Sequence, residues 1–338
     1  MKKIFFTCLL ISGLFSVSAF SFDFEVKSPV SEFYWDKKSL NSGIQPAASG
    51  RVESGLFGMV RNDGQRFHEG IDIKSFSRDG KGRVTDRVIA ACDGIVVHVC
   101  RENNGSYGKY VVIEHKSGKI LFYTLYAHLN EVSDNLEENK SVRAGEGVGI
   151  MGNTSSTYKF KTGTEHLHFE VGLRLGQNSF NDWYKNQFPA DDKNLHSFWN
   201  GLNLSGIDPV DFLKASENTS LHSFKNFLDS IPVAFSVVVS TKEIPEIIYF
   251  SPGLLAEKFV PEKIIGWKID FSWNGTPLKF KPLTEVKNQA FTGNKIVYVS
   301  KKYIQNSIIF GNIISKGENF EIGKKLSNNL KIIFGMQI

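Results

Sequence analysis

The 338-residue sequence has few cysteines, little net charge and no second long hydrophobic run. The formal net charge is only +5, and no basic cluster with interleaved aromatic residues is present. A nucleic-acid-binding surface is therefore not predicted, because such surfaces gather Lys and Arg. No internal repeat or low-complexity tract is evident. With 41% hydrophobic and 22% charged residues, the composition is that of a globular protein long enough for two domains.

The one long hydrophobic run lies near residue 1. Lys2 and Lys3 precede an apolar segment at 4–15, and Val-Ser-Ala at 17–19 fits the small-residue rule for signal-peptide cleavage. The run is short for a membrane span. We therefore expect residues 1–19 to be a signal peptide. The mature protein is expected to be exported, to the periplasm or to the extracellular space and cell wall, without a stable membrane span.

Cys92 and Cys100 would remain after that cleavage. Residues 94–99 between them, Gly-Ile-Val-Val-His-Val, have the composition of one strand. Eight extended residues span roughly 26 Å, whereas the Cα atoms of bonded cysteines lie about 5.5 Å apart. The two cysteines are therefore predicted not to pair with each other and to be buried as small hydrophobic residues.

Short apolar runs separated by glycine-containing turns follow from Gly50 onward. The predicted strands are 57–60, 71–73, 88–91, 94–100, 110–115, 121–126, two short ones within 142–152, and 166–173. Residues 77–87 are predicted to be a charged loop. Many short strands without a long helical period predict a mainly β, antiparallel domain. Residues 20–48 lack periodicity and are predicted to be a leader segment that wraps this domain or covers its cleft.

The pattern weakens after residue 173. We expect 174–206, with Trp183, Tyr184 and Trp199 among loop residues, to be an insertion, and 207–213 to close a first domain that spans 49–213. Residues 214–231 are predicted to be a connector. Residues 232–338 are predicted to be a smaller β-rich, sandwich-like domain of unknown role. Its predicted strands are 233–240, 246–250, 264–273, 294–300, 307–310 and 329–334.

The first stretch that carries chemistry is Phe-His-Glu-Gly-Ile-Asp at 67–72. It places His68 and Asp72 four residues apart. Glu69 suggests the helical His-Glu-x-x-His zinc motif, but the last position is Asp and Gly70 disfavours a helix. The pair alone is most often a hydrogen-bonded surface pair, so a metal is predicted only in combination with other residues.

The second stretch is Glu-His-Leu-His-Phe-Glu at 165–170. His166 and His168 are two residues apart in an alternating run, which puts both imidazoles on one face of a strand. Two His and one Asp are enough to hold zinc with one position open. His128, which follows the apolar run 121–126 by two residues, supplies a further imidazole. We therefore predict that these stretches form one site.

Together these motifs resemble the LytM/lysostaphin-type zinc endopeptidases of the M23 peptidase family. The matching segments run from about residue 50 to 173, and 207–213 looks like the usual ending. They are His-Glu-Gly-Ile-Asp-Ile at 68–73, Ala-Cys-Asp-Gly-Ile-Val at 91–96, Tyr-Gly-Lys-Tyr-Val-Val-Ile-Glu-His at 107–115, Tyr-Ala-His-Leu at 126–129 and His-Leu-His-Phe-Glu-Val at 166–171. The resemblance implies an antiparallel β-sheet groove. This sequence departs from the family pattern in two places, because loops 77–87 and 154–164 are longer than usual.

The resemblance also implies roles for single residues. His68, Asp72 and His168 would bind one Zn²⁺ per chain. His128 and His166 would stand beside the open position, with His166 accepting a proton from a zinc-bound water and His128 stabilising the oxyanion; these two roles are interchangeable. The implied activity is hydrolysis of peptide stems or cross-links of peptidoglycan, with a wall or protein partner for the C-terminal domain.

Two alternative functions stay open. One is a non-catalytic cell-wall-binding regulator on the same fold, which the presence of all five His and Asp residues disfavours. The other is a secreted peptidase that acts on foreign walls or glycine-rich proteins.

Several residues are weaker candidates for the surroundings of the site. Glu170 shares strand parity with the His pair and is predicted either to orient a ligand imidazole or to be an edge carboxylate. Tyr107 and Tyr110 are predicted either to contact substrate or to pack in the core. Arg61 and Asn62 are predicted to line the cleft.

Overall fold

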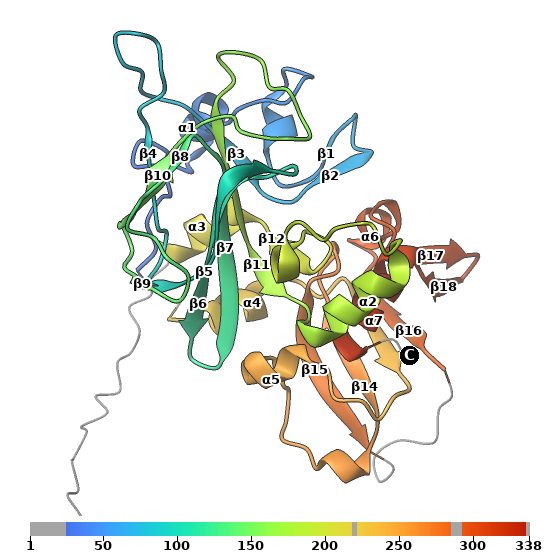
Figure 1. Ribbon diagram of the computed structural model, residues 1–338. Helices are drawn as coiled ribbons and strands as arrows, with labels where there is room; N and C mark the ends of the chain where they lie inside the picture. The colour runs from blue at the N-terminus through green and yellow to red at the C-terminus, as the bar shows by residue number, and fades with distance from the viewer. Residues whose placement is uncertain (1–24, 218–221, 285–292, 336–338) are drawn as a thin grey trace, which may run out of the picture.

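The computed structural model describes residues 25–217, 222–284 and 293–335 (Figure 1). Up to residue 217 its elements, with η marking a 3-10 helix, are α1 (Lys37–Gly43), η1 (Val52–Gly55), β1 (Gly58–Arg61), β2 (Arg66–His68), β3 (Ile71–Lys74), β4 (Arg87–Ile89), β5 (Gly94–Asn104), β6 (Gly108–Ser117), β7 (Ile120–Leu129), β8 (Glu131–Val132), β9 (Ser141–Val142), β10 (Gly147–Ile150), β11 (His166–Arg174), α2 (Asn178–Gln187), η2 (Ser197–Trp199), β12 (Leu204–Ile207) and α3 (Pro209–Ser216). The predicted mainly β, antiparallel fold is confirmed, and each strand predicted before residue 174 is present with its ends shifted by a few residues.

The main sheet of this half has the strand order β12-β11-β7-β6-β5-β9, and β3 also pairs with β11. Strand β11 is shared by three neighbours. One of its edges pairs with β7, while the other pairs first with β3, over 166–169, and then with β12, over 171–174. The predicted stretches at 67–72 and 165–170 therefore meet, because His168 lies directly opposite Asp72.

The two faces of the sheet carry different residues. On β11 the odd-numbered residues from Leu167 to Leu173 are buried in the main hydrophobic core. His166, His168 and Glu170 alternate with them and point to the opposite face. That face has a smaller core of its own, which contains Tyr107, Tyr110, Val112, Tyr123, Leu125, Ala127, Trp199 and Leu204. The three polar residues of β11 thus lie on a partly aromatic floor.

The described part of the predicted leader, residues 25–48, packs against the first domain. Val30 and Phe33 are fully buried, and Ile44 forms a bridge with Ile73 on β3. The Gln45 N–H donates to the backbone oxygen of Asp72 at 2.7 Å. This segment therefore wraps the domain, and it supports the strand that carries Asp72. The predicted signal peptide at 1–19 lies outside the described residues.

The predicted insertion contains more helix than expected. Trp183 and Tyr184 lie on α2, and Trp199 lies on η2, whereas the sequence analysis placed all three among loop residues. Phe180 and Trp183 are spaced for one helix face and both are buried. Helix α2 lies beside α7 of the C-terminal half (Figure 1).

The C-terminal half is built on one four-stranded antiparallel sheet in the order β15-β14-β13-β16. A separate hairpin, β17-β18, and several helices accompany it, so helices take up packing that a sandwich would give to a second sheet. The described elements after α3 are α4 (Phe224–Ser230), β13 (Phe235–Val239), α5 (Ile247–Phe250), η3 (Pro252–Leu254), η4 (Pro261–Lys263), β14 (Ile264–Phe271), β15 (Pro277–Thr284), β16 (Lys295–Val299), α6 (Ile304–Ile309), β17 (Ile313–Lys316), β18 (Asn319–Ile322) and α7 (Lys324–Phe334).

Three of the six strands predicted for this half are wrong. Residues 246–250, 307–310 and 329–334 lie in or at the ends of α5, α6 and α7. In α7 the buried Leu326, Leu330 and Ile333 recur at helical spacing, whereas the prediction used only the short apolar run at its end. The predicted strands at 233–240, 264–273 and 294–300 are confirmed as β13, β14 and β16.

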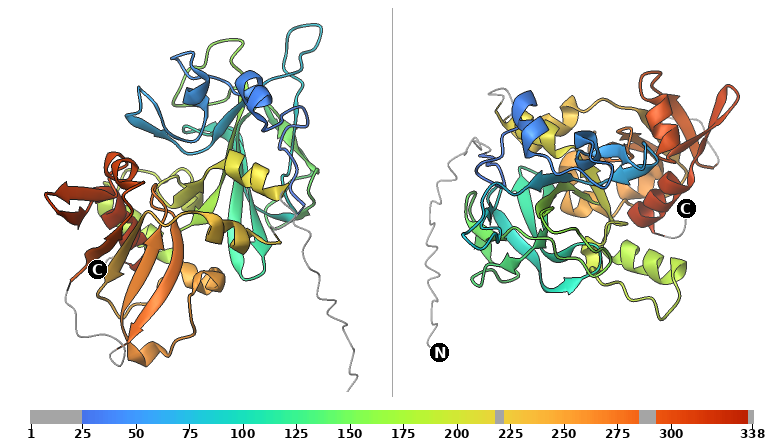
Figure 2. Two further views of the ribbon diagram at one scale, coloured as in Figure 1. Left: turned by 180° about the vertical axis from the view of Figure 1, so that it is seen from behind. Right: turned by 90° about the horizontal axis from the view of Figure 1, so that it is seen from above.

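The two halves lie side by side and share a packed seam (Figures 1 and 2). The carboxylate of Glu246 accepts hydrogen bonds from the backbone N–H groups of Gln177, Asn178 and Ser179, at 2.9 to 3.0 Å. It thereby caps the N-terminus of α2, whose first N–H groups have no partner within the helix. None of the described helices is long and apolar enough to cross a membrane.

Candidate metal centre

His68, Asp72 and His168 form a compact, buried group. His68 ends β2, while Asp72 and His168 are paired on β3 and β11. The Nε2 atom of His68 lies 3.1 Å from Nδ1 of His168 and 3.1 Å from Oδ1 of Asp72, and Nδ1 of His168 lies 3.0 Å from the same Oδ1. All three donor atoms thus face one point, and the group can hold a metal ion.

A glycine lets the chain reach this arrangement. Gly70 sits between β2 and β3, where a Cβ atom would lie 2.3 Å from the backbone oxygen of Phe169. That distance is far inside van der Waals contact, so a larger residue would push β3 away from β11. The close approach brings the carboxylate of Asp72 to the His pair.

The partners of the two imidazoles fix which nitrogen faces the centre. Nδ1 of His68 lies 2.8 Å from the backbone oxygen of Leu56, which can only accept, so Nδ1 carries the proton. Nε2 of His168 lies 2.9 Å from the Glu170 carboxylate, which likewise accepts. The second nitrogen of each ring points at the other ring and at Asp72, and in the neutral ring it is free to bind a metal ion. Three such donors in a buried space favour a positive charge among them, and a metal ion is one group that could supply it.

Neighbouring groups also shift the pKa values of Asp72 and His168. Burial alone would raise the pKa of Asp72, but the nearby His68 and His166 imidazoles and the hydrogen bonds from His168 and His68 hold that pKa well below its usual range. Burial alone would lower the pKa of His168, but its hydrogen bonds to Asp72 and Glu170 raise it to about 9. The carboxylate stays ionised, and the environment favours positive charge at the centre.

Glu170 lies beside a candidate ligand imidazole, which is the first of its two predicted positions, and is not an edge carboxylate. It is buried on the same face as His168 and also accepts a hydrogen bond from the hydroxyl of Tyr123 at 3.0 Å. The carboxylate therefore orients the His168 ring and is itself held in place. Tyr123 has no local sequence signal for this contact, because only the pairing of β11 with β7 brings it there.

His128 joins the group through an unusual backbone conformation. Ala127 pairs with His168, so simple alternation would turn the next side chain to the other face. His128 instead has φ +62°, a left-handed conformation that costs a residue with a Cβ about 1–3 kcal/mol, and the β6–β7 register shifts nearby. As a result, its ring lies 4.8 Å from the ring of His166 and 5.8 Å from that of His168.

The two remaining imidazoles are held by the two ends of one loop. Nδ1 of His128 donates to the backbone oxygen of Thr154, and Nδ1 of His166 donates to that of Thr164, both at 2.8 Å. Each ring therefore keeps Nε2 free of a proton in its neutral form. Burial, then the charge of neighbouring imidazoles, lowers the pKa of His128 well below its usual range; burial also lowers that of His166. Both are neutral acceptors at pH 7.

The loop at 154–164 also covers these rings. Phe160 lies edge-on to both of them, with ring centroids 4.8 Å from His128 and 5.1 Å from His166. Tyr158 accepts a hydrogen bond at 2.9 Å from the Arg66 guanidinium on β2, across the site. The sequence analysis noted that this loop was long but did not single out its aromatic residues.

Arg61 was predicted to line the cleft, but it directly contacts two of the candidate ligands. Its guanidinium donates to Nε2 of His68 at 2.8 Å and also hydrogen-bonds to Oδ2 of Asp72. At His68 it therefore uses the lone pair that a metal ion would use. Asn62, predicted beside it, is exposed in the β1–β2 turn with φ +50° and is not brought into the group.

Tyr107 and Tyr110 belong to the small core beneath the site. The Tyr107 ring lies 6.2 Å from the ring of His168, while the Tyr110 hydroxyl is 3.0 Å from Nδ1 of His196. Core packing, one of the two predicted alternatives, describes Tyr110, which is fully buried. Tyr107 packs there too, but next to a candidate ligand.

Cys92 and Cys100 are free, as predicted. The predicted burial is confirmed for Cys92 but is wrong for Cys100, which lies partly exposed on β5.

Comparison with known proteins supports the resemblance. Residues 66–181 match the model of Peptidase family M23, so the recognition of an M23-type segment is confirmed over that part of the chain. A comparison with curated proteins finds no match.

Similar solved structures include three peptidases. A zinc-containing peptidase from Vibrio cholerae is 30% identical over 31% of this chain and 26% of its own, with a TM-score of 0.24. The catalytic domain of the antimicrobial peptidase lysostaphin from Staphylococcus simulans is 22% identical over 53% and 98%, with a TM-score of 0.28. A putative glycyl-glycine endopeptidase LytM from Ruminococcus gnavus is 22% identical over 40% and 56%, with a TM-score of 0.27. This chain thus spans about a quarter of the Vibrio protein.

Proposed function

We propose that this protein is an exported zinc-dependent endopeptidase that hydrolyses peptide cross-links of peptidoglycan. The convergence of three possible metal-ligand atoms, on His68, Asp72 and His168, carries this proposal. We call these three residues the metal triangle. Two further imidazoles, on His128 and His166, lie beside it with their Nε2 atoms free. Metal-assisted hydrolysis needs a metal site with a neutral base beside it, and this arrangement offers both.

The donor set fits zinc. Two imidazole nitrogens and one carboxylate oxygen are zinc ligands, and three protein ligands leave a position open for catalysis. His68 Nε2, Asp72 Oδ1 and His168 Nδ1 would hold the ion. Leu56 and Glu170 would support the two imidazoles from behind. When bound, Zn²⁺ supplies Lewis acidity to a water molecule and to the scissile carbonyl.

The non-ligand imidazoles move the protons. Water adds its oxygen to the peptide carbonyl carbon and gives one proton to Nε2 of His166, which is neutral because burial lowers its pKa. When the C–N bond breaks, a protonated imidazole returns the proton to the leaving nitrogen. Because Nδ1 of His128 is tied to Thr154, its Nε2 can donate to the oxyanion only after that ring has been protonated. The roles of His128 and His166 remain interchangeable in this scheme.

The proposed substrate and location rest on the sequence. The M23 match over 66–181 supports a wall peptide as the substrate class. The basic and apolar residues at 1–15, followed by Val-Ser-Ala at 17–19, support export and cleavage after Ala19. Sequencing the N-terminus of the exported protein tests this directly, and a mature protein that begins at Met1 would contradict it.

The test of the function pairs metal content with product release. The mature protein is expected to contain about one zinc per chain and to release new free amino termini from purified peptidoglycan. His168→Ala is expected to lose both. His98→Ala is the matched control, because His98 is a half-buried histidine paired with Glu138 away from the triangle.

Two other outcomes would redirect the proposal. Stoichiometric zinc without cleavage of any wall preparation would indicate a wall-binding regulator. Cleavage of foreign walls or glycine-rich proteins, but not of the producer's own peptidoglycan, would indicate a peptidase that acts outside the cell.

A further inference from the structure

The turn between β14 and β15, residues 272–276, lies between the two segments that carry the candidate ligands. We propose that this turn of the C-terminal half, together with Phe310, positions His68 and thereby sets the metal affinity of the centre. The inference rests on the proposed function for the identity of the metal. It gives the C-terminal half a role inside the site.

Four aromatic rings connect the turn to the β1–β2 hairpin. They are Phe57 and Phe67 from the first half and Trp273 and Phe310 from the C-terminal half, and we call them the aromatic bridge. The Phe67 ring has its centroid 4.4 Å from that of Phe310, 5.9 Å from that of Trp273 and 5.1 Å from that of Phe57. Trp273 also lies 6.4 Å from Phe57 and 6.1 Å from Phe310. These distances are typical of aromatic pairs in contact.

The bridge acts on His68 in two ways. Phe67 precedes His68 on β2, and neighbouring strand residues point to opposite faces, so anchoring one ring fixes the direction of the other. Phe57 follows Leu56, whose backbone oxygen accepts the Nδ1 proton of His68. The bridge therefore holds both the strand that carries the imidazole and the carbonyl group that selects its tautomer.

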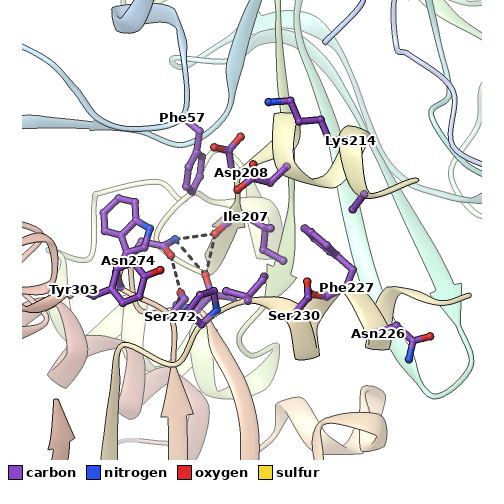
Figure 3. A pocket seen from close by; sticks show the side chains of 17 residues that line it. Phe57, Ile207, Asp208, Lys214, Asn226, Phe227, Ser230, Ser272, Asn274 and Tyr303 are labelled. Carbon is purple, nitrogen blue, oxygen red and sulfur yellow. Dashed lines mark hydrogen bonds between the residues drawn. The ribbon is translucent and has the colours of Figure 1, made fainter. Parts of the chain in front are cut away.

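The same turn is hydrogen-bonded to the other side of the centre (Figure 3). The backbone oxygen of Gly206 on β12 accepts from Asn274 Nδ2 at 2.8 Å and from Thr276 Oγ1 at 2.9 Å. Gly206 pairs with Gly172 on β11, the strand that carries His168. Residues 272–276 thus connect the hairpin of His68 to the sheet of His168.

The space around the turn makes the proposal testable. A cavity of about 690 Å³ lies beside it, lined in part by Phe57, Asp208, Trp273 and Tyr303. Trp273 is only partly buried beside this cavity, so Trp273→Ala is expected to fold. Phe310 is only partly buried, and Phe310→Ala provides a second, milder variant.

The experiment uses the full mature chain and two readouts. Zinc affinity is measured by competition with a chromophoric chelator, and backbone hydrogen exchange of residues 56–68 is measured on the metal-free protein. Trp273→Ala and Phe310→Ala are expected to bind zinc about 10-fold more weakly, as is usual when support of a ligand imidazole is lost. Both are expected to exchange faster at 56–68. Trp273→Phe keeps a ring and is expected to restore most of both.

Phe259→Ala is the matched control, because Phe259 packs on Trp267 within the C-terminal half. Equal zinc affinity in the bridge variants and the control would overturn the proposal, and so would unchanged exchange at 56–68. A wild-type protein that binds zinc but cleaves nothing would count against the proposed function alone. Failure of the wild type to bind zinc would defeat both.

Discussion

The four histidines of the centre fall into two pairs that are held in different ways. His68 and His168 are oriented by the buried framework, through a backbone oxygen just before β1 and the Glu170 carboxylate on β11. His128 and His166 are oriented by Thr154 and Thr164, which belong to one surface loop. The proposed metal-binding pair thus depends on the packing of the sheet, whereas the proposed acid–base pair depends on the position of a loop. Metal affinity and proton transfer should therefore respond to different mutations.

The largest effect is expected at Glu170. Glu170→Ala removes the acceptor that orients His168, and zinc affinity is expected to fall about 10- to 100-fold. Glu170→Gln keeps an acceptor oxygen and is expected to lose much less. Chelator competition at pH 7 measures both. Wild-type affinity in the Ala variant would show that the sheet alone orients His168.

An opposite change is expected at Arg61. Its guanidinium hydrogen-bonds to His68 Nε2 and to Oδ2 of Asp72, and the bond to His68 must be given up when a metal binds. Because hydrogen bonds to charged groups contribute about 1.5–3 kcal/mol, Arg61→Ala is expected to bind zinc about 10-fold more tightly. Arg51→Ala, which removes an exposed guanidinium paired with Asp63, is the control. Weaker zinc binding in Arg61→Ala would mean that the guanidinium supports the ligands.

The smallest effect is expected at Phe160, and only on the acid–base side. Burial lowers the pKa of His166 below its ordinary value of about 6.5, so the base stays neutral, and activity is retained, until the pH falls below that value. Phe160→Ala admits water to both rings and raises their pKa values. The acid limb of the pH–rate profile is expected to move to higher pH, toward the ordinary imidazole pKa of about 6.5, with kcat/KM at pH 7 changing less than about 1.5-fold.

Zinc affinity measured on the same Phe160→Ala sample is expected to equal that of the wild type. Lys159→Ala, an exposed neighbour in the loop, serves as the control. A profile that does not move, or one that moves together with zinc affinity, would show that the two pairs of histidines are not independent.

Much of the metal triangle could be predicted from the sequence because its residues belong to two short motifs with a defined spacing. The two-residue spacing of His166 and His168 fixes their common face, and the motif at 67–72 supplies the other donors. His128 could be named as a candidate, but alternation alone would turn it away; its positive φ and the nearby register shift leave no sequence pattern. Phe160 was missed because its role depends on where a loop folds.

The C-terminal half was harder to predict because its signals are ambiguous. The apolar run at the end of α7 is short enough to suit a strand, and its helical spacing extends back to Leu326. Strand β15 was missed because Pro277 and Pro282 argue against a strand; it is an edge strand, where proline is tolerated. Trp273 carries no motif, and only tertiary packing places it against Phe67.

The Glu246 cap on α2 bears on how this protein can be divided for expression or grafting. A chain ended near residue 231, where the sequence suggests a module boundary, would lose the carboxylate that three backbone N–H groups of α2 share. It would also expose the apolar side of α2 that packs on α7. We therefore expect the unit that folds cooperatively to be larger than the unit that carries the M23 motifs, so a transplantable unit would include both halves.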